Sequence, residues 1–148
     1  MERGFFKGKE FPKSEGEEFK NEFPSGKPGT DAKPDVSVDQ VTAADFDGVV
    51  IPGGYAPDLM RRSPQLVQFV KDLFDAGKTV SAICHAGWML ASAGVLKGKN
   101  ITSFFAIKDD MVNAGAEWVD QEVVMDGNLI TSRKYEYIFK VPKLKADR

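Results

Sequence analysis

Two short apolar runs, at residues 47–52 and 78–83, stand on either side of a stretch with helical periodicity. Asp-Gly opens the first run and Pro-Gly-Gly closes it, so turn-forming residues bound it at both ends. Runs of this length are typical of strands that are buried on both faces of a parallel sheet. Because parallel neighbours need a crossover connection, the helical stretch between them predicts a β-α-β unit.

The helical stretch carries its own start and stop signals. Ser63 can cap the first turn, and Pro64 suits the first helical position. A single apolar stripe follows at helical spacing, made of Leu66, Phe69, Val70, Leu73 and Phe74. Gly77 stands where a C-terminal cap belongs. These signals predict one helix that buries a single face.

The rest of the chain continues the alternation of strands and helices. The alternating segment Val36–Val41 predicts a short strand, and His85–Ala93 predicts a buried helix closed by Gly94. The further predicted elements are a strand at 101–104, a helix at 109–114 ending at Gly115, and a hairpin of 123–125 and 129–131 turning at Asp126-Gly127. This order predicts an α/β sandwich with a mainly parallel sheet over residues 36–148.

Residues 1–35 differ in composition from the rest of the chain. They are rich in Lys, Glu, Gly and Pro, and their five Phe residues follow neither helical nor alternating spacing. Two interpretations stay open: a poorly structured charged arm that docks its aromatic side chains on the domain, or a disordered segment.

Composition excludes several classes of function. A formal net charge of −2 favours neither nucleic acid nor an anionic membrane as a partner. The start of the chain lacks the apolar run of a secretory signal, and the longest apolar runs are far too short to span a bilayer. The single Cys cannot form an internal disulfide, which fits a reducing compartment. We therefore expect a cytoplasmic protein.

The numbers of Cys and His residues also limit the metal sites that the chain could form. A zinc site of the usual kind needs three or four Cys and His ligands, and the chain has one of each. No clustered Asp/Glu loop offers a substitute site. We expect neither a metal nor another cofactor.

Cys84 follows the second buried run directly, at a sharp turn from strand to helix. Ligands of parallel sheets bind at the carboxyl ends of the strands, and Gly53-Gly54 ends the first run at that same edge. A helix beginning at His85 would point its N–H groups and dipole at the sulfur and lower the pKa of the thiol. Backbone N–H groups of Gly54 and of His85 or Ala86 could hold an oxyanion. The pattern predicts a thiol nucleophile.

Each of these residues has a simpler interpretation. A free Cys is often a small buried apolar residue, and most Gly-Gly pairs are only turns. His85 is a candidate general base, but neighbouring residues at a helix start diverge, so it could instead cap the helix or pack.

Four segments together resemble the PfpI/ThiJ family: residues 45–58, 82–87, 108–120 and 126–133. The resemblance is strongest from residue 26 to residue 133. It implies a flavodoxin-like three-layer sandwich related to class I glutamine amidotransferases. It also implies an intracellular cysteine hydrolase, either a peptidase or a deglycase or glyoxalase, that acts on a small carbonyl or peptide substrate.

The resemblance also implies an acid supplied by a neighbouring subunit. Asp58 occupies the matching position after the Gly-Gly pair, where some members have Glu. The implied triad is Cys84, His85 and the Asp58 of another copy, which requires a homo-oligomer. The simpler interpretation is that Asp58 caps the following turn.

Both ends of the chain depart from the family pattern. Residues 1–25 lack the expected apolar strand and the acidic loop beside the nucleophile, and Glu15, Glu17 and Glu18 cannot be carried over. After Arg133 the chain diverges again at Lys134. This predicts a truncated or frame-shifted copy that lacks the first strand–helix–strand unit, with exposed apolar edges. A redox sensor, an inactive member and an assembly module that binds intact relatives are the alternatives to an enzyme.

Overall fold

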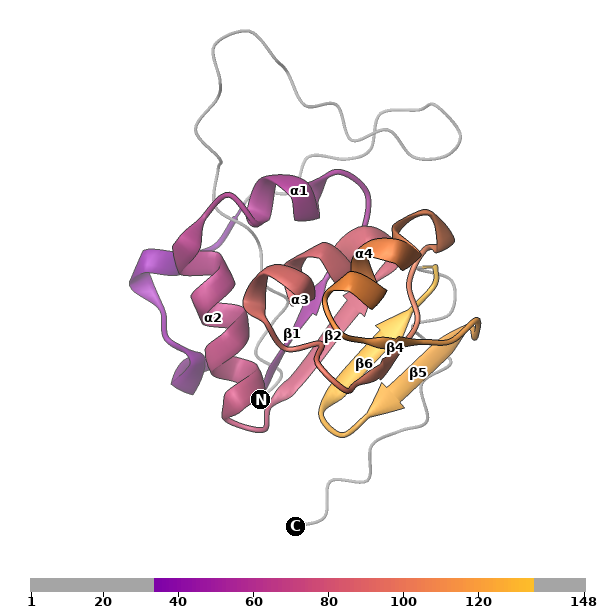
Figure 1. The fold of residues 1–148 in the computed structure, drawn as a ribbon. Coiled ribbons are helices and arrows are strands. Elements are labelled where there is room, and N and C mark those ends of the chain that lie inside the picture. The colour runs from indigo at the N-terminus through magenta and orange to yellow at the C-terminus, as the bar shows by residue number, and fades with distance from the viewer. Residues whose placement is uncertain (1–33, 135–148) are drawn as a thin grey trace, which may run out of the picture.

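The computed structural model describes residues 34–134, which contain a four-stranded sheet (Figure 1). Its strands are β1 (Gly48–Ile51), β2 (Thr79–Ile83), β5 (Val123–Asp126) and β6 (Leu129–Ser132), in the spatial order β1-β2-β6-β5. The pairs β1–β2 and β2–β6 are parallel, and β5–β6 is antiparallel. The predicted α/β class with a mainly parallel sheet is confirmed. The predicted arm lies almost wholly outside the described residues, as does the predicted absence of a first strand–helix–strand unit.

The helices lie on one face of this sheet (Figure 1). They are α1 (Ala56–Met60), α2 (Pro64–Asp75), α3 (Gly87–Ala93) and α4 (Lys108–Asn113), with short 3-10 turns η1 (Val38–Gln40), η2 (Ala43–Asp45), η3 (Cys84–Ala86) and η4 (Phe105–Ile107). The sheet residues packed in the core with the helices are Val49, Ile51, Val80, Ala82 and Leu129. Two layers of the sandwich therefore lie within the described residues.

Helix α2 confirms the predicted capping and periodicity. The Ser63 hydroxyl accepts the Leu66 N–H at 3.4 Å, and Pro64 opens the helix. Four residues of the predicted stripe are buried: Leu66, Phe69, Val70 and Leu73. Burial of each such side chain contributes about 1.5–3 kcal/mol, so this face fixes α2 on the sheet. Gly77 follows the helix with a φ of +71°, the left-handed conformation expected after a C-cap.

The predicted strand at Val36–Val41 is wrong, because the chain forms the 3-10 turn η1 there. The Gln40 N–H donates to the Ser37 carbonyl at 3.0 Å, and Val38 enters the core. Val38 and Val41 are three residues apart, so the apolar spacing of this segment does not hold the period of two that a strand needs.

Two further predicted boundaries shift. The strand predicted at 101–104 is the two-residue β3 (Asn100–Ile101), which pairs in parallel with β4 (Glu117–Trp118). The helix predicted from His85 begins at Gly87, after η3. Its predicted cap is confirmed, since Gly94 has a φ of +69°.

The predicted hairpin is confirmed, with its turn one residue later than expected. Asp126 pairs with Leu129, so Gly127 and Asn128 form a two-residue loop. The Asn128 amide donates to the Phe74 carbonyl at 3.0 Å and to the Lys78 carbonyl at 2.8 Å. The hairpin is thereby joined to the last turn of α2 and to the residue before β2.

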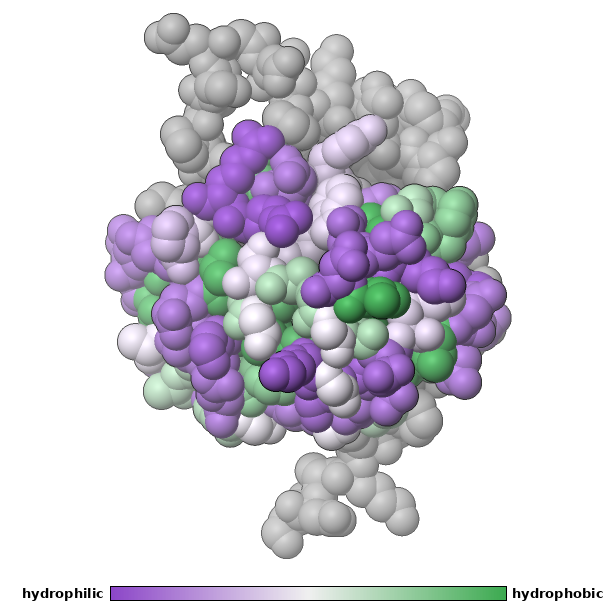
Figure 2. Space-filling view, in the orientation of Figure 1, coloured by the Kyte–Doolittle hydropathy of each residue, from purple (hydrophilic) through white to green (hydrophobic). Residues whose placement is uncertain are grey.

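On the face seen in Figure 2, hydrophilic residues predominate and apolar residues form separate groups among them. Within residues 34–134, no helix has both the length and the apolar character needed to cross a membrane. The sheet register brings the carboxyl ends of β1, β2 and β6 to one edge. Gly53, Cys84 and Lys134 follow these strands at that edge.

Candidate active site

Cys84 occupies a strained turn between β2 and η3. Its φ is +59°, and among residues 34–134 it is the one non-glycine residue with a positive φ. The left-handed conformation costs a residue with a side chain about 1–2 kcal/mol, so the surrounding structure must hold Cys84 in place. A strand-to-helix turn of this kind lifts the side chain out of the sheet.

Gly53 lies directly against this turn. A Cβ atom at Gly53 would stand 2.7 Å from the Cys84 Cβ and 2.9 Å from the Ile83 carbonyl oxygen. Only glycine allows the loop after β1 to come so close. Gly54 has a φ of +72°, and a Cβ there would meet no atom within 4 Å. The loop after β1 therefore has room for a side chain at Gly54 and none at Gly53.

The half-buried thiol has two backbone donors. Burial raises the pKa of the Cys84 thiol, whereas hydrogen bonds from the backbone N–H groups of His85 and Gly54 and the charge of Lys134 lower it; the net pKa lies above the ordinary value. The predicted lowering of the thiol pKa is therefore wrong in direction. Helix α3 begins at Gly87, so its dipole is not aimed from the residue next to the sulfur, and burial dominates.

His85 lies within reach of the thiol. Its Nδ1 atom is 3.3 Å from the Cys84 Sγ. The two residues are not consecutive in a regular helix, because Cys84 has a positive φ, and the divergence expected of helical neighbours does not apply. Burial lowers the pKa of His85, so its imidazole is neutral near pH 7. The resting pair is a neutral thiol beside a neutral base.

Two aromatic rings lie against His85. Its ring centroid is 4.8 Å from that of Phe104 and 5.2 Å from that of Trp88. The Phe104 N–H also donates to the Cys84 carbonyl at 3.2 Å. The indole Nε1 of Trp88 donates to the Asp110 carboxylate at 2.8 Å. The imidazole thus packs against one side chain from α3 and one from the segment after β3.

Asp58 lies in the first turn of α1, and its carboxylate pairs with Arg62 at 2.7 Å. The Arg62 side chain is largely exposed and that of Asp58 is about half exposed. Among residues 34–134, Asp58 forms no ion pair with His85. The structure brings Gly53, Gly54, Cys84 and His85 together, and it leaves Asp58 at the surface of the same copy.

A family model, DJ-1/PfpI, matches residues 15–143. The chain belongs to the DJ-1/PfpI family. It is 48% identical to the deglycase PfpI of Pyrococcus furiosus over 109 residues, which are 74% of this chain and 66% of that protein. It is 43% identical to YraA of Bacillus subtilis, which is named as a candidate cysteine protease, over 109 residues, 74% of this chain and 64% of YraA. The match therefore spans just under two thirds of each relative.

A solved structure supports the same assignment. Drosophila melanogaster DJ-1beta superposes with a TM-score of 0.65 and 41% sequence identity, over 73% of this chain and 61% of that chain. The flavodoxin-like α/β fold expected from the resemblance is thereby confirmed.

Three residues of this DJ-1/PfpI site were not predicted from the sequence. Trp88 stands three residues after His85, a spacing that could have indicated contact. Lys134 follows β6 at the sheet edge where Cys84 follows β2, and the rule that ligands bind at this edge could have drawn attention to it. Nothing in the sequence around Phe104 indicated a contact with His85, since the chain brings the two together through a turn that was not predicted. Ala86 is fully buried, and its predicted role as an oxyanion donor stays a prediction.

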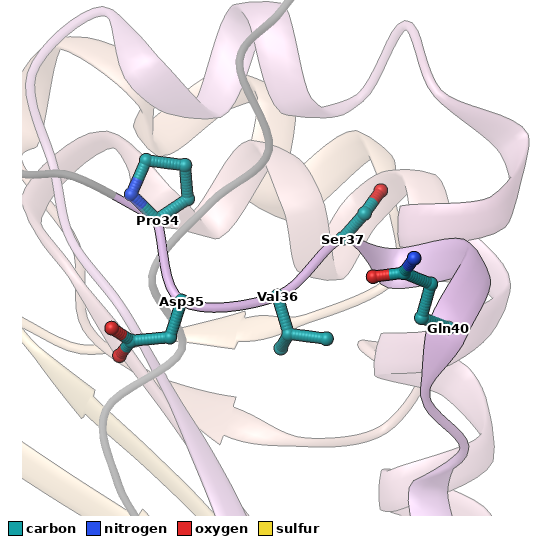
Figure 3. A pocket seen from close by; sticks show the side chains of 5 residues that line it. All are labelled: Pro34, Asp35, Val36, Ser37 and Gln40. Carbon is teal, nitrogen blue, oxygen red and sulfur yellow. The ribbon is translucent and has the colours of Figure 1, made fainter.

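A hollow elsewhere on the domain is unrelated to the thiol. Figure 3 shows its lining, which comes from one stretch of chain: Pro34, Asp35, Val36, Ser37 and Gln40. Within the described part of the chain, no three or more His, Cys, Asp or Glu side chains gather in a way that could hold a metal ion.

Proposed function

We propose that this DJ-1/PfpI protein is a cysteine-dependent hydrolase in which Cys84 is the nucleophile and His85 is the general base. The observation that carries the proposal is the 3.3 Å separation of the Cys84 Sγ and the His85 Nδ1 at a strained turn. A nucleophile and a base within hydrogen-bond reach are the minimum that covalent catalysis requires. The names deglycase and candidate cysteine protease among the relatives support the same class of reaction.

The resting state sets the order of events. Burial raises the pKa of the thiol and lowers the pKa of His85, so the proton stays on sulfur until a substrate arrives. As sulfur attacks a carbonyl carbon, the S–C bond forms, the C=O π pair moves to oxygen, and the thiol proton passes to Nδ1. General-base assistance of this kind contributes roughly 10²–10⁴-fold to a rate.

The developing oxyanion needs donors at the same edge. The N–H groups of His85 and Gly54 already point at the sulfur, and Gly54 borders open space. These groups, with the N–H of Ala86, are the proposed oxyanion donors. With a peptide or thioester, the imidazolium then returns its proton to the leaving amine or thiol as the C–N or C–S bond breaks, and water cleaves the remaining S–C bond to release the acid and the thiol. With methylglyoxal, attack on the aldehyde gives a thiohemiacetal, and transfer of its C1 proton to C2 through an enediol leaves a lactoyl thioester that water cleaves in the same way. An adduct first releases its amine or thiol as it collapses to the aldehyde.

The proposed substrates are small carbonyl compounds, their adducts with amines or thiols, and short peptides. The test measures consumption of methylglyoxal, release of its adducts from N-acetylcysteine and N-acetyllysine, and cleavage of a fluorogenic peptide. We expect at least one of these activities in the unmodified protein, a loss of about 10³-fold or more in Cys84→Ala, and a smaller loss in His85→Gln. Turnover that survives Cys84→Ala would reject the proposal, and absence of turnover on all substrates would favour an inactive member.

The oxidation-sensor alternative receives less support from the site. Sensor thiols are exposed and have a low pKa, because the thiolate is the species that peroxide oxidises. Cys84 is half-buried, and burial holds its pKa above the ordinary value.

We further propose that the protein forms a homo-oligomer in which the Asp58 of one copy orients the His85 of another. Asp58 supports this role because its carboxylate is at the surface, held by a single exposed i,i+4 ion pair of a kind worth only about 0.3–0.5 kcal/mol. A neighbouring copy could therefore engage it at little cost.

A further inference from the structure

Two aromatic rings contact the side chain of His85. Within residues 34–134, the imidazole lies against the Cys84 thiol and against the rings of Phe104 and Trp88. The planes make angles of 33° with Phe104 and 58° with Trp88. An imidazole in contact with two rings loses part of its freedom to turn about its side-chain bonds. The Trp88 ring therefore restricts the orientations open to Nδ1.

Trp88 is fixed from α4. Its Nε1–H donates to the Asp110 carboxylate at 2.8 Å, and Asp110 lies in the first turn of α4. The neighbouring backbone is also held close, since a Cβ atom on Gly87 would stand 2.5 Å from the Met111 sulfur. Helices α3 and α4 are thus in contact at Gly87, the residue before Trp88. The hydrogen bond from the indole to Asp110 joins the same two helices.

We propose that Asp110 and Trp88 are positioning residues, with Asp110 orienting the indole and the indole holding the His85 imidazole toward Cys84. The inference rests on the proposed function only in giving His85 its role as base; the arrangement of the side chains is independent of turnover. A hydrogen bond from a neutral donor to an ionised acceptor is stronger than a bond between neutral groups, which suits Asp110 to the task.

The chain offers a matched control for Asp110. Asp109 precedes it, is exposed like it, and also lies in the first turn of α4. Both carboxylates interact favourably with the helix dipole, so removing either costs α4 a similar amount. Asp110 differs in accepting the bond from Trp88. Asp109→Ala therefore removes a charge alone, and Asp110→Ala removes a charge together with the hydrogen bond from Trp88.

The test uses the single histidine of the chain as a reporter. Its ring protons are unique in an NMR spectrum, and their shifts and NOE contacts to the indole measure its placement against the two rings. In Asp110→Ala we expect weaker NOE contacts between His85 and Trp88 and altered ring-proton shifts, with a fall in kcat of about two- to fivefold and an unchanged KM. Asp110→Asn should restore all three, because its amide oxygen can accept the same bond. Asp109→Ala should match the unmodified protein.

A second variant keeps the proposal falsifiable if Asp110→Ala also loosens α4. Trp88→Phe retains a ring against His85 but removes the Nε1–H. It should behave like Asp110→Ala, and Asp110→Ala should have no further effect on the His85 resonances in the Trp88→Phe background. Unchanged His85 resonances in Asp110→Ala would overturn the proposal, as would equal changes in Asp109→Ala. If the unmodified protein shows no turnover, the proposed function fails while the resonances still decide the positioning.

Discussion

The Nδ1 atom of His85 lies 3.3 Å from the Sγ atom of Cys84, although the two residues are neighbours in the chain. Neighbours in a strand point to opposite faces, and neighbours in a helix diverge by about 100°. The positive φ of Cys84 removes both restrictions at once. The same backbone conformation therefore lifts the thiol out of the sheet and brings its base within reach.

The thiol should react with electrophiles at higher pH than free cysteine does. Burial raises the pKa of Cys84, so the thiolate fraction near pH 7 is below that of a free thiol, whose pKa is ~8.5. We expect the rate of iodoacetamide alkylation to rise with pH and to reach half its maximum above ~8.5. Because Cys84 is the single cysteine, mass spectrometry of the intact protein follows it alone.

Lys134 supplies the control for this profile. Its positive charge lowers the pKa of Cys84, so Lys134→Gln should move the alkylation profile to still higher pH, and added salt should shrink the difference. Lys108 is also exposed but lies over the Trp118 ring, and Lys108→Gln should leave the profile in place. A profile centred well below ~8.5 in the unmodified protein would contradict the burial argument.

The free energy of unfolding should fall as the pH drops below ~6.5 through protonation of His85. Burial lowers the pKa of His85 in the folded state, so its contribution is fully present above the ordinary pKa and is lost as the pH falls through the folded value. Urea unfolding at pH 7.5, 6.5 and 5.5 measures the trend. His85→Gln cannot titrate and should show a shallower dependence over this range; equal slopes in both proteins would count against the prediction.

Gly53 and Gly54 should respond differently to the same substitution. Gly53→Ala places a Cβ 2.7 Å from the Cys84 Cβ and should destabilise the fold by about 1–3 kcal/mol while slowing alkylation of the displaced thiol. Gly54→Ala meets no atom within 4 Å and should cost about 1–2 kcal/mol through its positive φ alone. Denaturant unfolding and the alkylation rate separate the two cases. Similar alkylation rates in both variants would refute the close-approach argument.

Mixing two inactive variants tests whether Asp58 acts on another copy. If it does, a mixed oligomer of Cys84→Ala and Asp58→Ala contains one site with an intact Cys84 and an intact Asp58. We expect each variant alone to have little activity. After unfolding and refolding together, the mixture should recover about a quarter of the activity of the unmodified protein, because about half of randomly paired dimers are mixed and one of their two sites is intact. Refolding the variants separately before mixing is the control. No recovery on joint refolding would place Asp58 outside the site of a neighbouring copy.

The elements that could be predicted from the sequence are those with local signals. Ser63, Pro64 and the apolar stripe specify α2, and the two apolar runs around it specify the β-α-β unit, although Val50 of the first run is exposed. The position of Cys84 at the sheet edge follows from the same unit. The strand predicted at Val36–Val41 was wrong because its three valines match a strand pattern only in part. Their spacing also fits the 3-10 turn that forms there.

The features of the site that could not be predicted depend on contacts between segments that are distant in the sequence. The pKa of Cys84 is set by burial, which the packing of Gly53 and its loop determines. Phe104 reaches His85 because its N–H bonds to the Cys84 carbonyl, a contact between residues in separate elements. No local pattern marks either interaction, so neither could be derived from spacing.

The parallel pairing of β2 with β6 has a consequence for the order of folding. The Asn128 amide bonds the Lys78 carbonyl across 50 residues of sequence, and closing so long a loop is slow and entropically costly. The β1-α2-β2 unit closes a shorter loop and contains both Gly53 and Cys84. We expect the nucleophile turn to be largely formed in the transition state and the hairpin to dock afterwards. Stopped-flow kinetics should then give a φ-value near 1 for Val80→Ala and near 0 for Leu129→Ala; the reverse order would show that the hairpin nucleates the sheet.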